Sequence, residues 1–149
     1  MSQVDVQQLR IAAQKYQKAF QLLSASISKT SDFDADKDYT ADELEPFDAL
    51  SDRFIRIVEV AIKLFRTYEY YMQAQQSQTL RDGLHQMEKF GLISGIDIWL
   101  EMRDVRNRIV HDYIPEKVAE MYLLVRTVFY QELTRLSDKT NDLNLPSSD

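Results

Sequence analysis

Apolar residues recur through most of this chain at alternating spacings of three and four positions, which is the period of an amphipathic α-helix. The first such stripe predicts a helix from about Val4 to Ser28. Its apolar positions are Leu9, Ala13, Tyr16, Phe20, Leu23 and Ile27. No segment alternates apolar and polar residues as a half-buried strand does. The pattern therefore predicts an all-α fold.

A second stripe is both longer and wider, and it predicts a central helix that is contacted on more than one side. Thr40 and Glu43 have the spacing of a capping box, so the helix is expected to begin directly after Thr40. A Gln-rich stretch, Gln73 to Gln78, is expected to end it. The apolar positions are Phe47, Leu50, Phe54, Ile57, Val58, Ala61, Leu64, Phe65, Tyr68, Tyr71 and Met72.

Between these two helices, residues Lys29 to Tyr39 contain four Asp and no periodic apolar pattern. The Asp residues alternate as in a calcium-binding EF-hand loop, but the required Gly and closing Glu are missing. We therefore predict a solvated loop that binds no metal. The alternating residues are Asp32, Asp34, Asp36 and Asp38.

Two shorter helices follow. Thr79 is a candidate N-cap for a helix from Leu80 to Phe90, and Gly91 suits a left-handed stop. The next helix is predicted from Ser94 or Gly95 to between His111 and Tyr113, because Ile114 precedes a proline and is biased away from helical geometry. Its predicted apolar side consists of Ile96, Trp99, Leu100, Met102 and Val110.

Pro115 suits the first position of a last helix, which we predict to end in a polar tail. We expect a single up-and-down bundle of about five helices, forming one domain over residues 1–149. Its core is expected over about 4–137, with a frayed tail over 138–149. The apolar positions of this helix are Val118, Tyr122, Val125, Phe129, Leu133 and Leu136.

Composition narrows the classes of function. The chain has no cysteine, which excludes disulfides, thiol catalysis and thiolate metal sites. Its net charge of −6 disfavours broad electrostatic binding to nucleic acid but leaves room for a local basic patch around Arg103, Arg106 and Arg108. No apolar stretch reaches the roughly 20 residues that span a bilayer, and no signal peptide is recognised, so we expect a cytoplasmic protein without a membrane partner.

The segment Arg106 to Tyr113 carries the candidate chemistry. His111, one of two histidines, can give and take protons near neutrality, and the planar fork of Arg106 suits phosphate oxygens. Together they suit metal-independent phosphodiester cleavage, in which RNA supplies the nucleophile as its 2′-hydroxyl. Such cleavage needs both an acid and a base, so a single histidine implies two copies of the chain. The other histidine, His85, is interpreted as a surface or interface residue.

Helix geometry leaves the pairing of these residues open. Asn107 and His111 are four positions apart and would share one face, whereas Arg106 lies roughly 140° around the helix from His111. Convergence requires the arginine to swing across, a distortion near His111, or a second subunit. Alternatively, Arg106 and His111 only cap carbonyls and interact favourably with the dipole at the helix end.

The sequence Arg106-Asn107-x-x-x-His111-x-Tyr113 resembles the signature of the HEPN superfamily, and the resemblance covers roughly residues 4 to 137. Gly91-Leu92-Ile93 and Trp99-Leu100-Glu101-Met102 are similar to its small bacterial branch, which contains HepT-type toxins and nucleotidyltransferase substrate-binding proteins. The resemblance implies a HEPN-like helical bundle that forms a homodimer.

For a toxin, the resemblance implies a metal-independent endoribonuclease without cofactors. Arg106 would stabilise the scissile phosphate, Asn107 would position it, and His111 would transfer protons. A nucleotidyltransferase antitoxin would transfer AMP to Tyr113 and so block the RNA substrate. The alternative is a non-catalytic partner subunit that helps a nucleotidyltransferase bind its substrate. A purely structural bundle is the third interpretation.

Overall fold

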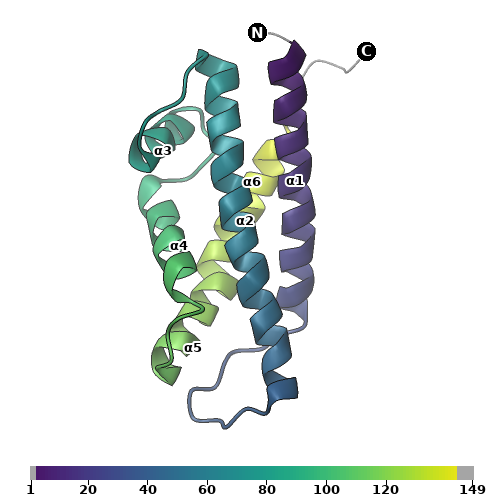
Figure 1. Ribbon diagram of the computed structural model, residues 1–149, viewed down its shortest axis with the longest axis vertical. Coiled ribbons are helices and arrows are strands. Elements are labelled where there is room, and N and C mark those ends of the chain that lie inside the picture. Colours follow the sequence, from purple (N-terminus) through teal and green to yellow (C-terminus); the bar gives the residue numbers. More distant parts are fainter. Residues whose placement is uncertain (1–2, 144–149) are drawn as a thin grey trace.

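A computed structural model describes residues 3–143, and the regular secondary structure in that range is entirely helical (Figure 1). The elements are α1 (Gln3–Ser28), α2 (Ala41–Gln73), α3 (Leu80–Lys89), α4 (Ile96–Arg108), α5 (Pro115–Leu124), the π-helical turn η1 (Val125–Phe129) and α6 (Tyr130–Asn141). Because α5, η1 and α6 follow without a break, the described residues form five helical rods. The predicted all-α bundle is confirmed. Within the described range, no helix has both the length and the apolar character needed to cross a membrane.

The longest helix, α2, occupies the middle of the arrangement. It runs antiparallel to α1, packs on its other side against α3 and α4, and has the α5–η1–α6 rod behind it (Figure 1). The wide apolar stripe of α2 thus meets neighbours on several sides, as predicted. This arrangement places the C-terminal end of α4 and the N-terminal end of α5 near the lower end of the bundle.

The buried apolar side chains form one core cluster that links all the rods. Aromatic pairs join elements that are far apart in sequence: Phe54 of α2 stacks on Phe129 of η1 with ring centroids 5.7 Å apart, and Phe65 meets Trp99 of α4 edge-on at 4.8 Å. Offset and edge-to-face contacts of this kind add to the stabilisation from burial. The first contact ties η1 to α2, and the second helps to fix how α4 lies against α2.

Local signals in the sequence place several helix ends correctly. The Thr40 hydroxyl accepts from the Glu43 amide at 3.2 Å, and the Glu43 carboxylate accepts from the Thr40 amide at 3.1 Å, which completes the capping box. The Thr79 side chain caps α3 by accepting from the Asp82 amide at 3.1 Å. Gly91 has a φ of 78°, the left-handed conformation predicted after that helix.

The end of α4 differs from the prediction. The helix ends at Arg108 rather than near His111 to Tyr113, and residues 109–111 form a turn. The amides of His111 and Asp112 both donate to the Arg108 carbonyl, at 2.9 and 3.0 Å. Val110 was predicted on the apolar side, but it is 52% exposed, because the core position is taken by Ile109. The chain needs these residues to reverse direction before α5.

The predicted tail also begins too early. Helix α6 continues to Asn141, and Thr140 is buried, with its hydroxyl donating to the Leu136 carbonyl at 2.7 Å. Packing of α6 against α1 therefore extends the helix beyond the last apolar position of the stripe. Residues 144–149 of the predicted tail lie outside the described residues.

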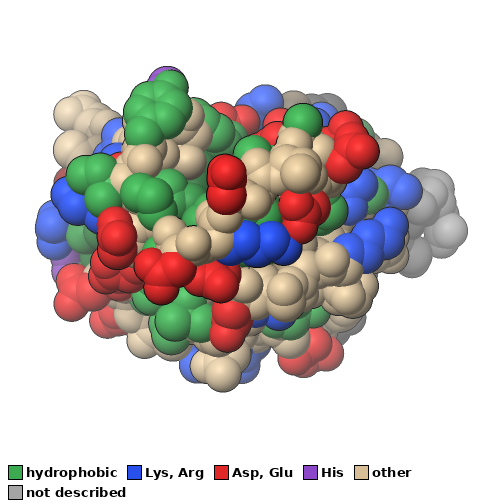
Figure 2. All heavy atoms as spheres, turned by 90° about the horizontal axis from the view of Figure 1, so that it is seen from below, with side chains coloured by type: hydrophobic (Ala, Val, Ile, Leu, Met, Phe, Trp, Pro, Cys, Tyr) green, Lys and Arg blue, Asp and Glu red, His purple; other side chains and the backbone are tan. Residues whose placement is uncertain are grey.

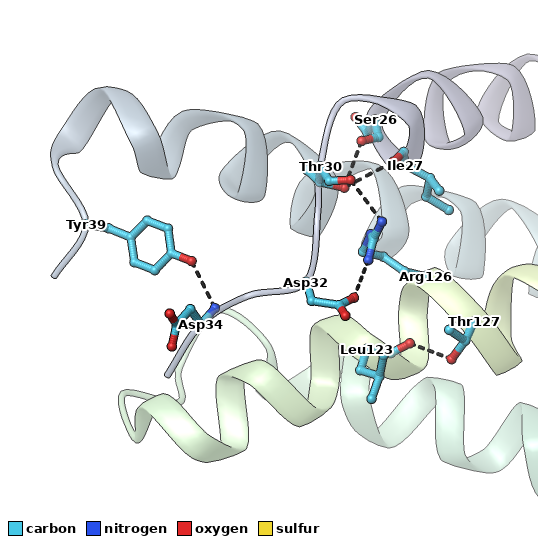
Figure 3. Close-up of polar contacts among 9 residues, drawn as sticks. All are labelled: Ser26, Ile27, Thr30, Asp32, Asp34, Tyr39, Leu123, Arg126 and Thr127. Atoms are coloured by element: carbon cyan, nitrogen blue, oxygen red, sulfur yellow. Dashed lines mark hydrogen bonds and ion pairs between the residues drawn. The ribbon is translucent and has the colours of Figure 1, made fainter. Parts of the chain in front are cut away.

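The segment between α1 and α2 is a loop, as predicted, but it is anchored rather than simply solvated. Arg126 of η1 donates to the Asp32 carboxylate at 2.6 Å and to the Thr30 carbonyl at 2.9 Å (Figure 3). Phe33 stacks on Tyr39 with centroids 4.7 Å apart. The sequence pattern missed this anchoring because a single apolar residue has no periodicity.

Candidate functional site

The packing of α4 determines which motif side chains face outward. Met102, Val105 and Ile109 follow one another at spacings of three and four, and all three are buried. With that face turned toward the core, Asn107 is exposed and Arg106 is partly exposed. The same helix register that builds the core therefore presents two of the predicted site residues at the surface.

Arg106 has two polar partners. Its Nη1 donates to Asn107 Oδ1 at 2.7 Å, and its Nη2 forms an ion pair with the Glu59 carboxylate of α2. The Arg106 side chain is 32% exposed and that of Glu59 is 53% exposed. Because solvent-exposed ion pairs contribute at most about 1 kcal/mol, an anionic ligand can replace Glu59 at low cost. No pattern in the sequence predicts Glu59 as a partner, because it lies 47 residues from Arg106 along the chain.

Arg108 connects the end of α4 to the turn that follows. Its guanidinium pairs with Asp104 at 3.0 Å and with Asp112 at 3.6 Å. The hydrogen bond from Arg108 to Asp104 raises the pKa of the guanidinium, and Asp112 adds to this effect. Arg108 therefore stabilises the turn that carries His111, and its charge is already balanced by two carboxylates.

The segment between α4 and α5 presents an imidazole and a phenol to solvent. His111 is exposed, Tyr113 is 87% exposed, and the Ile114 amide donates back to the Asp112 carboxylate at 3.2 Å. Within residues 3–143, no hydrogen bond or ion pair joins the side chains of Arg106 and His111. The helix ends at Arg108 and gives way to a turn, which is a distortion near His111 of the kind considered above. In a single chain, the side chains of Arg106 and His111 are nevertheless not in contact.

Two surface hollows each contain one residue of the motif, Arg106 in the first and Tyr113 in the second. The first, here called the α2–α4 groove, has a volume of about 380 Å³. It is lined by Glu59, Val60, Ile62, Lys63, Arg66, Arg103 and Arg106. The second, here called the lower cleft, has a volume of about 610 Å³ and contains Tyr113 in its wall. Arg106 and Tyr113 thus open onto different hollows, and His111 lines neither of them.

The lower cleft combines apolar and acidic side chains. Phe33, Ile55 and Val118 contribute to its apolar wall. Asp48 and Asp52 contribute carboxylates, and Lys37 contributes one ammonium group. Viewed from below, Asp and Glu side chains are spread among hydrophobic ones over this end of the bundle (Figure 2). Such a surface disfavours a nucleic-acid strand and suits a protein contact.

The arrangement can bind an anion at Arg106 and transfer a proton at His111. It offers one imidazole per chain, so a reaction that needs both an acid and a base requires a second copy. Within the part of the chain that the structure describes, no three His, Asp or Glu side chains are grouped so that they could hold a metal ion.

Comparison with protein-family models gives a match over most of the chain. Residues 11–142 match the model of a family described as nucleotidyltransferase substrate binding protein like. The matched range includes α2 to α5 and the whole Arg106 to Tyr113 segment, and it accounts for most of the chain. No curated protein matches the chain.

Proposed function

The chain belongs to the nucleotidyltransferase substrate binding protein-like family, and from this membership we propose that it is a HepT-like toxin of the HEPN superfamily. It cleaves RNA without a metal ion, and a nucleotidyltransferase antitoxin neutralises it in the cytoplasm. The observation that carries the proposal is that four motif side chains, at the end of α4 and in the segment after it, are exposed or partly exposed. Arg106 and Asn107 are hydrogen-bonded to each other, and His111 and Tyr113 are exposed in the segment between α4 and α5.

The cleavage step uses groups that the chain and the RNA supply. His111 removes the proton from a ribose 2′-hydroxyl, and the resulting oxygen attacks the adjacent phosphorus. The bond to the 5′-oxygen breaks, and that oxygen takes a proton from the His111 of a second copy. The products are a 2′,3′-cyclic phosphate and a 5′-hydroxyl end. Arg106 stabilises the negative charge that grows on the phosphoryl oxygens.

Neutralisation acts on Tyr113. At 87% exposure, its hydroxyl is open to a second enzyme, and the acidic and apolar wall of the lower cleft offers a docking surface beside it. The phenolic oxygen attacks the α-phosphorus of ATP, loses its proton, and pyrophosphate leaves. The attached AMP places a negative charge and a bulky group two residues from His111. RNA phosphates are then repelled from the proton-transfer group.

The decisive experiment is growth arrest on expression in bacteria without the partner enzyme. We expect the wild type to arrest growth, and Arg106→Ala and His111→Ala to abolish the arrest. The matched controls are His85→Ala, the other histidine, and Arg56→Ala, an exposed arginine on α2 paired with Asp52. Both controls should remain toxic. A harmless wild type, with RNA left intact by the purified protein, would rule out the toxin.

The modification of Tyr113 has a separate test. After co-expression with the neighbouring nucleotidyltransferase, intact-protein mass spectrometry should show the addition of at least one AMP group, located on Tyr113 by peptide mapping. Tyr113→Phe should remain unmodified and toxic in the presence of the partner. Tyr70, another exposed tyrosine, serves as the internal control. An unmodified Tyr113 in a neutralised cell would exclude this mechanism.

A second function is favoured by two observations. The family description itself names substrate binding, and Glu59 already occupies the guanidinium of Arg106. In this case the chain is a non-catalytic subunit that binds a nucleotidyltransferase and helps it to hold its substrate. The chain would then be harmless alone, and adding it would lower the KM of the partner enzyme.

A further inference from the structure

The α2–α4 groove concentrates positive charge in a chain whose net charge is −6. Glu59, Lys63 and Arg66 lie at spacings of four and three on α2, so they share one helix face. Arg103 and Arg106, three apart on α4, form the opposite wall. We propose that this groove binds the phosphate backbone of a single RNA strand beside the bond that is cut. The proposal rests on the proposed function and assigns the strand-binding residues Lys63, Arg66 and Arg103.

Among the described residues that line the groove, Arg106 pairs with Glu59, whereas the three cations assigned to the strand have no carboxylate partner, as is also true of other lysines and arginines of the chain. Among the described residues, Arg56, Arg108 and Arg126 each pair with an aspartate. In the same part of the chain, no ion pair involves the three cations assigned to the strand, and all three are exposed. These cations are Lys63, Arg66 and Arg103. Their charge is therefore available to a ligand, and the low-dielectric walls of a groove strengthen its field.

The dimensions of the groove fit several phosphates. From Glu59 to Arg66 the helix rises about 10.5 Å, and from Arg103 to Arg106 about 4.5 Å, at 1.5 Å per residue. A stacked strand advances about 3.4 Å per nucleotide, so the α2 wall spans about three nucleotides. The partly buried side chains of Val60 and Ile62 form the apolar part of the lining. The groove thus suits a short stretch of strand better than a single phosphate.

Among the described residues that line the groove, Glu59 is the one acid, and it pairs with the arginine that the cleavage step needs. A phosphate that binds Arg106 must displace this carboxylate, since both use the same guanidinium. Replacing Glu59 with glutamine removes the competing charge and one repulsive contact with the strand. Glu59→Gln should therefore bind RNA more tightly, in the opposite direction to the loss of a cation.

Fluorescence anisotropy with a 2′-O-methyl RNA oligonucleotide tests the groove, because the blocked 2′-oxygen prevents cleavage and isolates binding. The variants are Lys63→Gln/Arg66→Gln, Arg103→Gln and Glu59→Gln, each measured over a series of KCl concentrations. The matched control is Lys15→Gln/Lys18→Gln, two exposed lysines with the same spacing on α1. Thermal melting confirms that each variant is folded.

We expect the slope of log K against log[KCl] to fall by about 0.7 for each groove cation removed, with an affinity loss of about tenfold for the double variant. The Lys15→Gln/Lys18→Gln control should match the wild type, and Glu59→Gln should bind more tightly. An unchanged slope in the folded Lys63→Gln/Arg66→Gln variant would overturn the proposal. Binding of ATP through these residues, without binding of the strand, would also overturn it.

The two proposals fail separately in this design. A wild type that binds the methylated strand through the groove but leaves ordinary RNA uncut would disprove the cleavage and keep the strand site. Equal rates of RNA cleavage by the wild type and by Lys63→Gln/Arg66→Gln would keep the cleavage and remove the strand site.

Discussion

A single buried hydroxyl, that of Tyr16, ties the first helix to the last. It donates to the Leu133 carbonyl at 2.6 Å, and the side chain has no exposed surface. Burial raises the pKa of Tyr16 well above its ordinary value of 10.0, and the charge of Glu132 adds to this effect. The folded state therefore keeps its proton at a pH where the unfolded chain loses it. This contribution to stability is complete below about pH 10 and is lost as the pH rises further.

Tyr16→Phe should lower the free energy of unfolding by about 1 kcal/mol near neutral pH, because the Leu133 carbonyl loses its donor. The variant should also lose less stability than the wild type as the pH rises above about 10. Urea unfolding across that pH range measures both effects. Tyr70→Phe, at an exposed position, is the control and should behave as the wild type. An unchanged alkaline slope in Tyr16→Phe would contradict the assignment.

Glu132 is a buried carboxylate that accepts hydrogen bonds from three donors. It accepts from the Ser94 amide at 3.0 Å, the Ser94 hydroxyl at 2.7 Å and the Trp99 indole at 2.8 Å. Glu132→Ala would leave these donors unsatisfied and should cost about 3 kcal/mol. Glu132→Gln keeps one acceptor oxygen and should cost less. Chemical denaturation of both variants checks the order, and equal losses would show that the hydrogen bonds contribute little.

At the scale of elements, two glycines with open space around them have opposite roles. Gly91 adopts a φ of 78° after α3, whereas Gly83 lies inside that helix, and an added Cβ would meet no atom within 4 Å at either position. Gly91→Ala should therefore destabilise the protein by about 1 kcal/mol through backbone strain alone. Gly83→Ala should stabilise it by about 0.5–1 kcal/mol. Thermal unfolding measures both, and a shift of the same sign would refute the argument.

At the scale of the whole molecule, the proposed chemistry requires two chains. Exposed apolar residues flank His111, with Val110 at 52%, Tyr113 at 87% and Ile114 at 49% exposure. We expect sedimentation to give twice the mass of one chain. Val110→Asp should dissociate this dimer and reduce RNA cleavage, because a charge would be buried in the contact. Ile11→Asp, at an exposed apolar position of α1, is the control and should remain dimeric and active. A monomeric wild type that cuts RNA would exclude the shared site.

The sequence by itself determined the helices and most of their ends. The Thr40 capping box, the Thr79 cap, the Gly91 stop and Pro115 at the start of α5 are all signals read within one helical turn. The apolar period identified the buried faces, because a helix repeats its orientation every 3.6 residues. The motif residues were also readable, since their chemistry depends on residue type and short spacing.

Tertiary structure alone decided what surrounds the motif. Glu59 meets Arg106 only because α2 packs beside α4, and Arg126 reaches Asp32 only because η1 passes the loop. The early end of α4 and the extension of α6 to Asn141 depend on chain reversal and on packing against a neighbour. Such contacts join residues that are distant along the chain. No local sequence pattern predicts them, because the partners come together only when the chain folds.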